Sequence, residues 1–337
     1  MIKRTTLSVN LREFRSSDYD RLVEIYNANY PDYATSVAEQ RARDGSIDTT
    51  RYLLRRFTSL DALSGEIVGF GGISHVLDMF HPQKFMITVW VDPERHRMGI
   101  GGAIYDRLLQ ELIDLNAIVV WTRNKEDQIE HREFLKRRGF HEKSKALESR
   151  LDLTAFDPTP FQKYLLQVER AGIRFYSLQE ELSSGRKSLR AIHQLVQDVV
   201  ADMPSVAPFT PVPYDQWEKL ELSNPNLLPE GWVIAKRGQE YLGLSIVYSI
   251  DKEPRNLSQG DTGVTRGYRG RGIATALKLK VIDFGKRNGY EMLKTWNDSK
   301  NTAMLAINIK LGFKPQVGWI TMEKTLVAAT HSSSVSG

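Results

Sequence analysis

Two glycine-rich turns carry arginines and have the residue types of a phosphate-binding loop. Each follows a β-type segment that ends in valine, Val91 or Val264, and each opens a segment with helical spacing. Such a turn points free backbone N–H groups and the positive end of the helix dipole at one place, where an anion can bind. Small residues let the anion approach the backbone, and arginines add charge-assisted hydrogen bonds. The residues concerned are Arg97, Met98, Gly99, Ile100, Gly101 and Gly102 in the first turn and Arg269, Gly270, Arg271, Gly272, Ile273 and Ala274 in the second.

The phosphate ligand that suits these turns is neither a nucleoside triphosphate nor a dinucleotide. A Walker loop ends in Gly-Lys-Ser/Thr, which neither turn contains. A dinucleotide fingerprint needs G-x-G-x-x-G after the first strand of a βαβ unit. Both turns come late, after a predicted hairpin, and the second has Ala274 at a glycine position.

The turns belong to an internal repeat that keeps one register without a gap. Val91 matches Val264 (264 − 91 = 173), Thr122 matches Thr295 (295 − 122 = 173), and Gly139-Phe140 matches Gly312-Phe313 (312 − 139 = 173). Chance can supply any one of these matches, but a shared supersecondary unit explains all three.

The elements around each turn follow the order β-β-α-β-α, which predicts a mixed sheet flanked by helices. β-Branched and aromatic runs indicate strands, and apolar residues at helical spacing indicate helices. In the first copy we expect strands at 67–76, 85–91 and 117–121 and helices at 99–115 and 126–138. In the second we expect strands at 241–250, 263–264 and 291–296 and helices at 273–286 and 303–311. Segments 7–14 and 173–178 are the expected first strands.

With its valine, its arginine and its small residues, the second turn resembles the acetyl-CoA pyrophosphate loop of the GNAT superfamily of N-acetyltransferases. The following strand and the helix that ends in Gly-Phe keep the family's order, and the tandem arrangement resembles two-domain GNAT proteins of the mycothiol synthase type. The resemblance covers both copies. It implies an α/β fold made of two tandem GNAT folds, each a mixed, mostly antiparallel sheet flanked by helices.

The resemblance also implies roles for single residues. Backbone N–H groups at Val264 and Val91 match the positions that polarise the thioester carbonyl, as an oxyanion hole does. Asn301 matches the asparagine that contacts the cofactor, and Asn297 is expected to bind it as well. No metal is implied.

The expected proton-transfer groups favour the second copy as the catalyst. Asp261 lies before its loop and is a candidate base, although a strand-end carboxylate in a turn is an equal alternative. The first copy has Thr88 there and also His96 where the family has Arg or Gln, so it is expected to bind CoA without turnover or only to support the fold. The family's tyrosine is replaced by Asn308 and Leu135, which leaves another donor, Tyr248 or Tyr268, or unaided loss of the thiolate.

The chain is expected to divide into an N-terminal domain (1–155), a linker helix (156–172), a C-terminal domain (173–330) and a disordered tail (331–337). Asp157 and the two prolines that follow favour the start of the linker helix.

Composition limits the remaining possibilities. The 337 residues include no cysteine, which excludes disulfides, thiolate zinc sites and a cysteine nucleophile. No signal peptide or membrane span is expected, so a cytoplasmic protein is the default, and the net charge of +5 is too small to indicate nucleic acid.

The expected function is transfer of an acetyl group from acetyl-CoA to a primary amine of a small molecule, by a monomer or homodimer. Two alternatives stay open: an acetyl-CoA-binding sensory or structural protein without turnover, and an N-acyltransferase that acts on proteins or uses aminoacyl groups.

Overall fold

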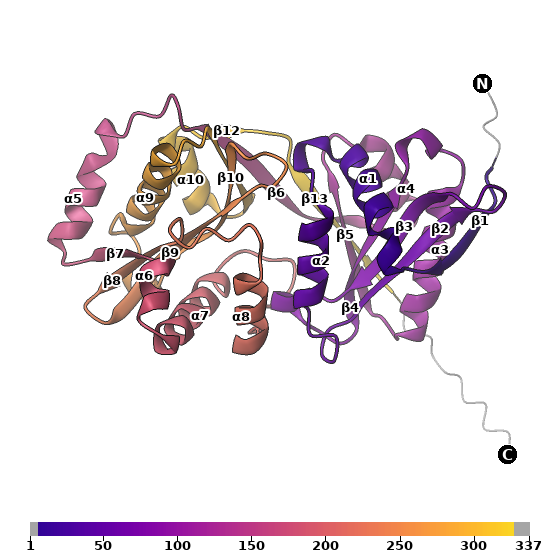
Figure 1. Cartoon of the computed structure of the whole chain (residues 1–337), viewed down its shortest axis with the longest axis horizontal. Coiled ribbons are helices and arrows are strands. Elements are labelled where there is room, and N and C mark those ends of the chain that lie inside the picture. Colours follow the sequence, from indigo (N-terminus) through magenta and orange to yellow (C-terminus); the bar gives the residue numbers. More distant parts are fainter. Residues whose placement is uncertain (1–5, 327–337) are drawn as a thin grey trace, which may run out of the picture. The chain divides into compact units, whose positions relative to one another are not determined.

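The computed structural model describes residues 6–326, which form two compact units. The N-terminal unit contains the described residues of 1–124, 128–143 and 320–337, and the C-terminal unit contains 125–127 and 144–319. The units are therefore not continuous along the chain, because each includes a segment from beyond the other (Figure 1). The tail expected at 331–337 lies outside the described residues.

The N-terminal unit is built on one sheet in which β1, β2, β3, β4, β5 and β13 are successive neighbours. Its strands are β1 (Val9–Glu13), β2 (Leu54–Asp61), β3 (Ile67–Ser74), β4 (Lys84–Val91), β5 (Val119–Lys125) and β13 (Trp319–Thr325). Its helices are α1 (Tyr19–Asn29), α2 (Val37–Ser46), α3 (Ile100–Asp114) and α4 (Ile129–Lys136), with short 3-10 turns η1 (Ser16–Asp18), η2 (Pro31–Tyr33), η3 (Leu77–Met79) and η4 (Pro93–Arg95).

Helices cover both faces of this sheet because residues of β3 alternate between them. Phe70 packs with Leu22 and Ile25 of α1 on one face. Gly71 points to the other face, where a Cβ would lie 2.5 Å from the side chain of Ile104, so glycine lets α3 approach the sheet closely. β1 to β4 pair antiparallel, whereas β4 and β5 pair parallel.

The C-terminal unit repeats this plan on a second sheet, in which β6, β11, β10, β9, β8 and β7 are successive neighbours. Its strands are most of β6 (His141–Asp152), β7 (Arg174–Ser177), β8 (Val233–Arg237), β9 (Glu240–Ser249), β10 (Asn256–Val264), β11 (Met292–Asp298) and β12 (Lys314–Pro315). Its helices are α5 (Gln162–Arg170), α6 (Leu178–Ser183), α7 (Arg186–Val200), α8 (Tyr214–Leu222), α9 (Ile273–Arg287) and α10 (Thr302–Leu311), with 3-10 turns η5 (Thr159–Phe161) and η6 (Arg266–Tyr268).

Two glycines again bring helices close to opposite faces of the sheet. A Cβ on Gly243 would lie 3.2 Å from Leu277 of α9, and one on Gly263 would lie 2.3 Å from Val199 of α7. β9 and β10 pair antiparallel with a bulge between Gln259 and Thr262, and β10 and β11 pair parallel.

The structure confirms the mixed sheet flanked by helices in both copies. The predicted hairpin of the first copy is β3–β4, and its predicted helices are α3 and α4. In the second copy β9, β10, α9, β11 and α10 follow in the predicted order. Helix α5 lies in the segment predicted as a linker helix, and this segment is within the C-terminal unit. None of the helices within residues 6–326 combines the length and apolar character needed to cross a bilayer.

Each sheet includes a strand that lies outside the main run of its unit along the chain. This strand is β13 in the N-terminal unit and β6 in the C-terminal unit. Ile320 and Met322 of β13 are buried in the N-terminal core beside Ile104 and Leu108. Leu151 of β6 is buried in the C-terminal core, and β6 pairs antiparallel with β11 from Ala146 to Asp152. Because these residues are within cores, β13 stabilises the N-terminal unit and β6 stabilises the C-terminal unit.

A buried carboxylate fixes the entry to α1. Asp18 is 3% exposed at its side chain and accepts two hydrogen bonds from the Arg12 guanidinium, at 2.7 and 2.9 Å. It also accepts bonds from the Arg15 amide at 2.9 Å and from Thr58 Oγ1 at 2.8 Å. Burial by itself raises the pKa of Asp18, but these bonds outweigh it and lower the pKa from 3.8 to about 2.

We expect Asp18→Asn to lower the free energy of unfolding by about 2 kcal/mol at pH 7, since each pKa unit corresponds to about 1.4 kcal/mol. A lowered folded-state pKa stabilises above the unfolded value of 3.8, and this stabilisation is lost as the pH falls towards 2. Urea unfolding of wild type and variant should therefore differ at pH 7 and converge between pH 4 and 2. Asp20→Asn, at an exposed position of α1, is the control. A difference that persists at low pH would contradict this role.

Candidate functional site

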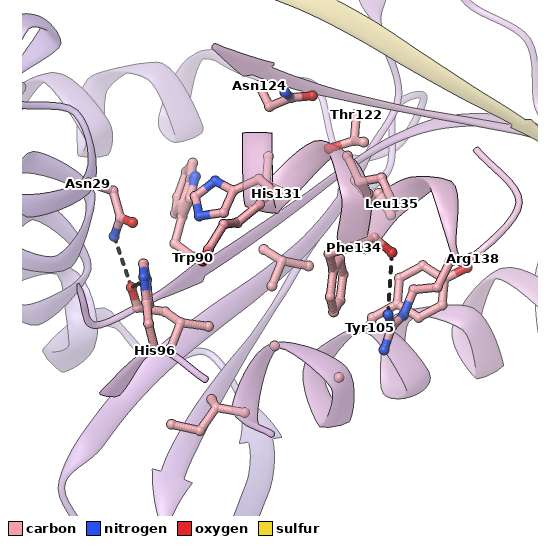
Figure 2. A pocket seen from close by; sticks show the side chains of 18 of the residues that line it. Asn29, Trp90, His96, Tyr105, Thr122, Asn124, His131, Phe134, Leu135 and Arg138 are labelled. Atoms are coloured by element: carbon pink, nitrogen blue, oxygen red, sulfur yellow. Dashed lines mark hydrogen bonds between the residues drawn. The ribbon is translucent and has the colours of Figure 1, made fainter. Parts of the chain in front are cut away.

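A cavity of about 450 Å³ opens in the N-terminal unit where β4 and β5 separate. The two strands pair only from Lys84 to Met86 and from Val119 to Trp121. Beyond that point β4 stays paired with β3 but no longer with β5, and the ends of β4 and β5 line the cavity. Figure 2 shows the side chains that surround it. Its wall includes β4 residues 87–91, the loop and first turn of α3 (95–97 and 99–102), β5 residues 122–124, part of α4 (130, 131, 134 and 135), Arg137 and Arg138, and Asn29, Tyr30 and Tyr105.

The loop predicted to bind phosphate forms one wall of this cavity. Arg97 and Gly99 have φ angles of 67° and 87°, in the left-handed region, and α3 begins directly afterwards. Gly101 and Gly102 lie in the first helical turn, whose N–H groups lack partners within the helix. A Cβ on Gly101 would meet only Val91 Cγ2, at 3.6 Å. The chain therefore directs a helix N-terminus with little side-chain bulk into the cavity, which suits an anion.

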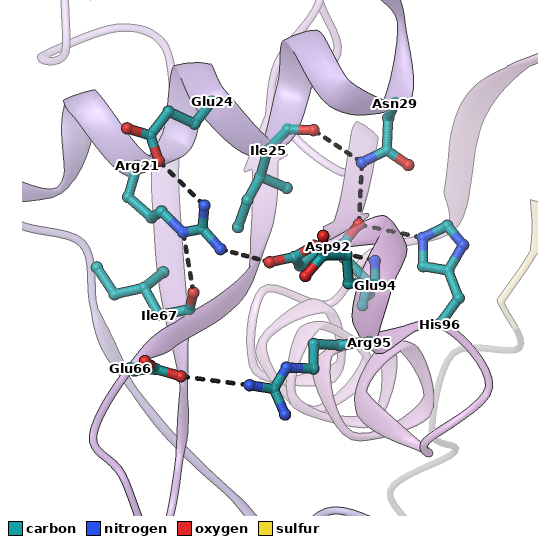
Figure 3. Close-up of polar contacts among 11 residues, drawn as sticks. Arg21, Glu24, Ile25, Asn29, Glu66, Ile67, Asp92, Glu94, Arg95 and His96 are labelled. Carbon is teal, nitrogen blue, oxygen red and sulfur yellow. Dashed lines mark hydrogen bonds and ion pairs between the residues drawn. The ribbon is translucent and has the colours of Figure 1, made fainter. Parts of the chain in front are cut away.

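The end of β4 is held so that one backbone edge faces the cavity. The Asp92 amide donates to Val68 O at 3.0 Å on the β3 side, so the preceding carbonyl, that of Val91, points the opposite way. Asn29 Nδ2 donates to Val91 O at 2.9 Å, and His96 Nε2 lies 3.1 Å from the same oxygen (Figure 3). In an extended strand the N–H of a residue points to the same side as its C=O. The Val91 N–H is therefore on the cavity side, as the oxyanion-hole prediction requires.

His96 performs the contact that Arg269 performs in the second copy. Arg269 Nε donates to Val264 O at 2.9 Å, and the positions correspond (269 − 96 = 173). The carbonyl can only accept, so His96 carries its proton on Nε2 in this bond. His96, which stands where the family has Arg or Gln, therefore keeps the side-chain contact to the carbonyl of the valine that precedes the loop.

Cationic side chains surround the α3 end of the cavity. Arg138 stacks on Phe134 with its guanidinium carbon 3.6 Å from the ring centroid, and its Nη2 would lie 3.4 Å from a Cβ on Gly102. Among the described lining residues Glu130 is the one carboxylate, and it pairs with Arg97 at 3.1 Å. The arginines of the lining are Arg95, Arg97, Arg123, Arg137 and Arg138. This excess of positive charge favours a ligand with several negative charges.

Burial shifts the pKa of two lining side chains, His131 and Tyr30, that were not singled out from the sequence. Burial lowers the pKa of His131, and the adjacent His96 lowers it further, so the His131 imidazole is neutral at pH 7. Burial raises the pKa of Tyr30 to about 12, so its phenol keeps its proton. The internal repeat gave no signal for His131, because its counterpart is Met304, which does not titrate (304 − 131 = 173). Tyr30 follows α1, a region that the repeat does not mark.

The second loop has the same backbone but a different environment. Gly270 and Gly272 have φ angles of 75° and 79°, at the positions of Arg97 and Gly99. Arg266 and Arg269 both donate to Asp202, which follows α7. These hydrogen bonds, led by that of Arg266, lower the pKa of Asp202 to about 2. Arg271 donates to Gly267 O at 3.0 Å. All three arginines of this loop therefore have partners within the protein.

The residues predicted for catalysis and cofactor contact in the second copy fall into two groups. Asn308 is buried and donates to Asn297 Oδ1 at 2.7 Å, so the structure brings these two predicted residues together. Asn301 is the N-cap of α10 and accepts from the Met304 amide at 3.3 Å.

The second group surrounds the bulge of β10. Asp261 lies near Glu221 of α8, which accepts a hydrogen bond of 2.8 Å from Tyr248. Burial raises the pKa of Glu221 to about 7, and the charge of Asp261 contributes to the rise. Tyr268, the other candidate donor, is bonded to Glu240 at 2.6 Å in an exposed position.

No group of three or more His, Asp or Glu within residues 6–326 is placed to hold a metal ion.

Comparison with known proteins places both copies in one family. The model of the acetyltransferase (GNAT) family matches residues 19–140 and 192–313. The fold resembles a tandem GNAT protein from the clavulanic acid biosynthesis pathway (TM-score 0.72, 16% identity, 94% of this chain and 98% of that one). It also resembles a GCN5-related N-acetyltransferase from Sphaerobacter thermophilus (TM-score 0.66, 16% identity, 95% and 97%).

A curated relative adds a local match in sequence. An uncharacterised N-acetyltransferase of Methanocaldococcus jannaschii is 34% identical over 62 residues, which are 18% of this chain and 27% of that protein. The chain therefore spans about a quarter of the length of this relative. With a family model matched twice and a phosphate-type loop in each matched region, the chain belongs to the acetyltransferase (GNAT) family and carries the fold in tandem.

Proposed function

We propose that the N-terminal unit binds acetyl-CoA in the cavity between β4 and β5 and transfers the acetyl group to a primary amine of a small molecule. The observation that carries this proposal is the cavity itself, which joins the separated strands to the N-terminus of α3. Sequence reasoning favoured the second copy, whose loop matches the family pattern more closely. The order is reversed here because the first loop lines an open cavity, whereas the carboxylate of Asp202 accepts hydrogen bonds from two arginines of the second loop.

The lining residues fit the parts of the donor. The first-turn amides of α3 at Gly101 and Gly102 suit the diphosphate, and Arg138 lies beside them. The exposed edge of β4 suits an extended chain with amide groups, which can pair as an added strand does. A volume of about 450 Å³ is within the usual range for small-molecule sites.

The residues of the cavity support direct attack by the amine on the donor carbonyl. Bound acetyl-CoA supplies an activated acyl carbon, and the products are an amide and the CoA thiol. The Val91 N–H stabilises the negative charge that develops on the carbonyl oxygen. His131 is neutral at pH 7 and accepts the proton that the amine loses, directly or through water. Leu135 stands where the family has a tyrosine, so proton delivery to the thiolate falls to solvent or to a phenol of the lining, Tyr30 or Tyr105.

The test is release of CoA thiol in the presence of amines. Because the chain has no cysteine, a thiol-reactive dye reports CoA alone. We expect acetyl-CoA and a panel of small primary amines to give catalytic release above hydrolysis, with mass spectrometry detecting the acetylated amine. Matched tertiary amines, which have no N–H to replace, are the control and should give none. Binding of acetyl-CoA without release for any amine would favour a sensory or structural protein, and release only with lysine-containing peptides would favour a protein acetyltransferase.

A further inference from the structure

The repeat allows the surroundings of the two loops to be compared position by position. Around the first loop, Gly99, Phe134 and Arg137 line the open cavity. Their counterparts at an offset of 173 are Gly272, Ile307 and Lys310. In a pair of related folds, these counterparts mark where a ligand of the second loop would lie.

A side chain of the linker helix is in contact with those counterparts. Tyr164 of α5 lies against Gly272, where a Cβ would be 3.2 Å from its ring. Lys310 Nζ donates to the Tyr164 hydroxyl and lies 4.4 Å from the centroid of its ring. Tyr164 and Ile307 both pack against the same hydrophobic core. One phenol therefore spans from the N-cap of α9 to the last turn of α10.

Helix α5 is anchored so that Tyr164 stays in this position. Val168 is 1% exposed within the C-terminal core, and Leu165 packs against it. Phe161, just before α5, stacks on Phe156 with ring centroids 5.6 Å apart. The anchoring residues thus belong to the same core as α9, the helix whose N-terminus Tyr164 contacts.

Two arginines of the second loop also have a carboxylate partner within the same unit. Asp202 accepts hydrogen bonds from Arg266 at 2.9 Å and from Arg269 at 2.5 Å, so a carboxylate already pairs with two guanidinium groups of a type that binds phosphate. Between β11 and α10 the Asn297–Asn308 bond joins the two elements directly. In the N-terminal unit the corresponding residues, Asn124 and Leu135, line the cavity instead.

We propose that the C-terminal unit contains a latent second acetyl-CoA site, which Tyr164 of α5 covers and Asp202 neutralises, so that one chain binds one donor. This inference rests on the proposed binding of acetyl-CoA to the N-terminal unit. The second loop already has the left-handed backbone at Gly270 and Gly272. Opening this site therefore requires α5 to move away, and the loop itself does not need to change.

The first test is titration calorimetry with acetyl-CoA, combined with hydrogen exchange of the two loops. We expect one site per chain, with protection at residues 97–103 and none at 270–276. Two sites in the wild-type chain would overturn the latent site and leave the proposed function standing. No binding would overturn the proposed function, and one site with protection at 270–276 would overturn both.

The second test opens the covered loop. We expect Tyr164→Ala to raise the stoichiometry from one towards two and to add protection at 270–276, with the new site weaker than the first. Leu166→Ala changes a side chain on the same helix that is 51% exposed and should leave one site. Tyr164→Phe keeps the ring against Gly272 but loses the hydrogen bond from Lys310, and it should also leave one site. This variant therefore tests whether the ring alone is enough to cover the loop. If the folded Tyr164→Ala variant still binds one donor only, Tyr164 does not close the site and the inference fails.

Discussion

Gly101→Glu is expected to abolish acetyl-CoA binding by the chain while leaving it folded. Gly101 is the second residue of α3, and a Cβ there would make only an ordinary contact of 3.6 Å with Val91. A glutamate in the first turn also interacts favourably with the helix dipole and improves on glycine in helix propensity, so stability should not fall. The same carboxylate would occupy the place of the diphosphate and repel it. We expect affinity to fall at least about 100-fold, which corresponds to about 3 kcal/mol.

The second copy offers a matched control for this variant. Ala274 is the counterpart of Gly101 (274 − 101 = 173) and also lies in the first turn of its helix. Because the proposed site is in the N-terminal unit, Ala274→Glu should bind acetyl-CoA as the wild type does. Calorimetry and CoA release should be measured for both variants, with thermal unfolding to confirm that they are folded. The reverse pattern, loss with Ala274→Glu and not with Gly101→Glu, would return the donor site to the second copy.

The second large effect concerns a buried lysine of α9 in the C-terminal unit. Lys278 is 1% exposed, and its ammonium donates to Gln259 Oε1. Gln259 donates in turn to Ser245 at 2.9 Å, and Ser245 shares a bond of 2.7 Å with Thr262. Burial lowers the pKa of Lys278 from 10.5 to about 7. The lysine therefore lowers the free energy of unfolding, since the amine is protonated far more readily in the unfolded chain than in the folded protein.

We expect Lys278→Met to stabilise the protein by roughly 2 kcal/mol at pH 7, because removal of the amine outweighs the loss of one hydrogen bond at Gln259. Between pH 7 and 10.5 the unfolded wild type binds the proton that the folded one lacks, so wild-type stability rises with pH. The advantage of the variant should shrink by about 1.4 kcal/mol for each pH unit in this window.

Urea unfolding at pH 7, 8 and 9 measures this dependence directly. Arg287→Met, on the same helix at a side chain that is 68% exposed, is the control and should show a difference that hardly changes with pH. An advantage for Lys278→Met that stays constant over the window would mean that the lysine is charged in the folded protein throughout.

Local features of the chain were visible in the sequence because they depend on neighbouring residues. The two loops, the strands before them and the helices after them were predicted from residue types and spacing, and β3, β4, α3, β9 and α9 confirm them. The left-handed backbone at Gly99 and Gly272 also follows from local chemistry, since glycine adopts it without a steric cost. Arg97 adopts the same conformation without glycine, which only the structure reveals.

Several elements had no comparable signal. Helices α1, α2, α7 and α8 and strands β2 and β8 lie in the parts of each copy where the repeat leaves no matching motif. Asn29 and Tyr30, at the end of α1, therefore entered the site only through the structure. His131 and Arg138 were within a predicted helix and near its end, but nothing in their spacing indicated which face would meet a cavity.

The sequence by itself determined the family, the tandem repeat and both loops, because these are encoded in short motifs at a fixed offset of 173 residues. Tertiary structure decided which strand completes which sheet, since a strand's alternating pattern shows that it has a buried face and not which partner covers it. It also decided that a cavity opens at the first loop while Tyr164 and Asp202 contact the second. Those contacts join residues that lie from about 65 to more than 100 positions apart, and contacts over such separations depend on how the helices pack against the sheet.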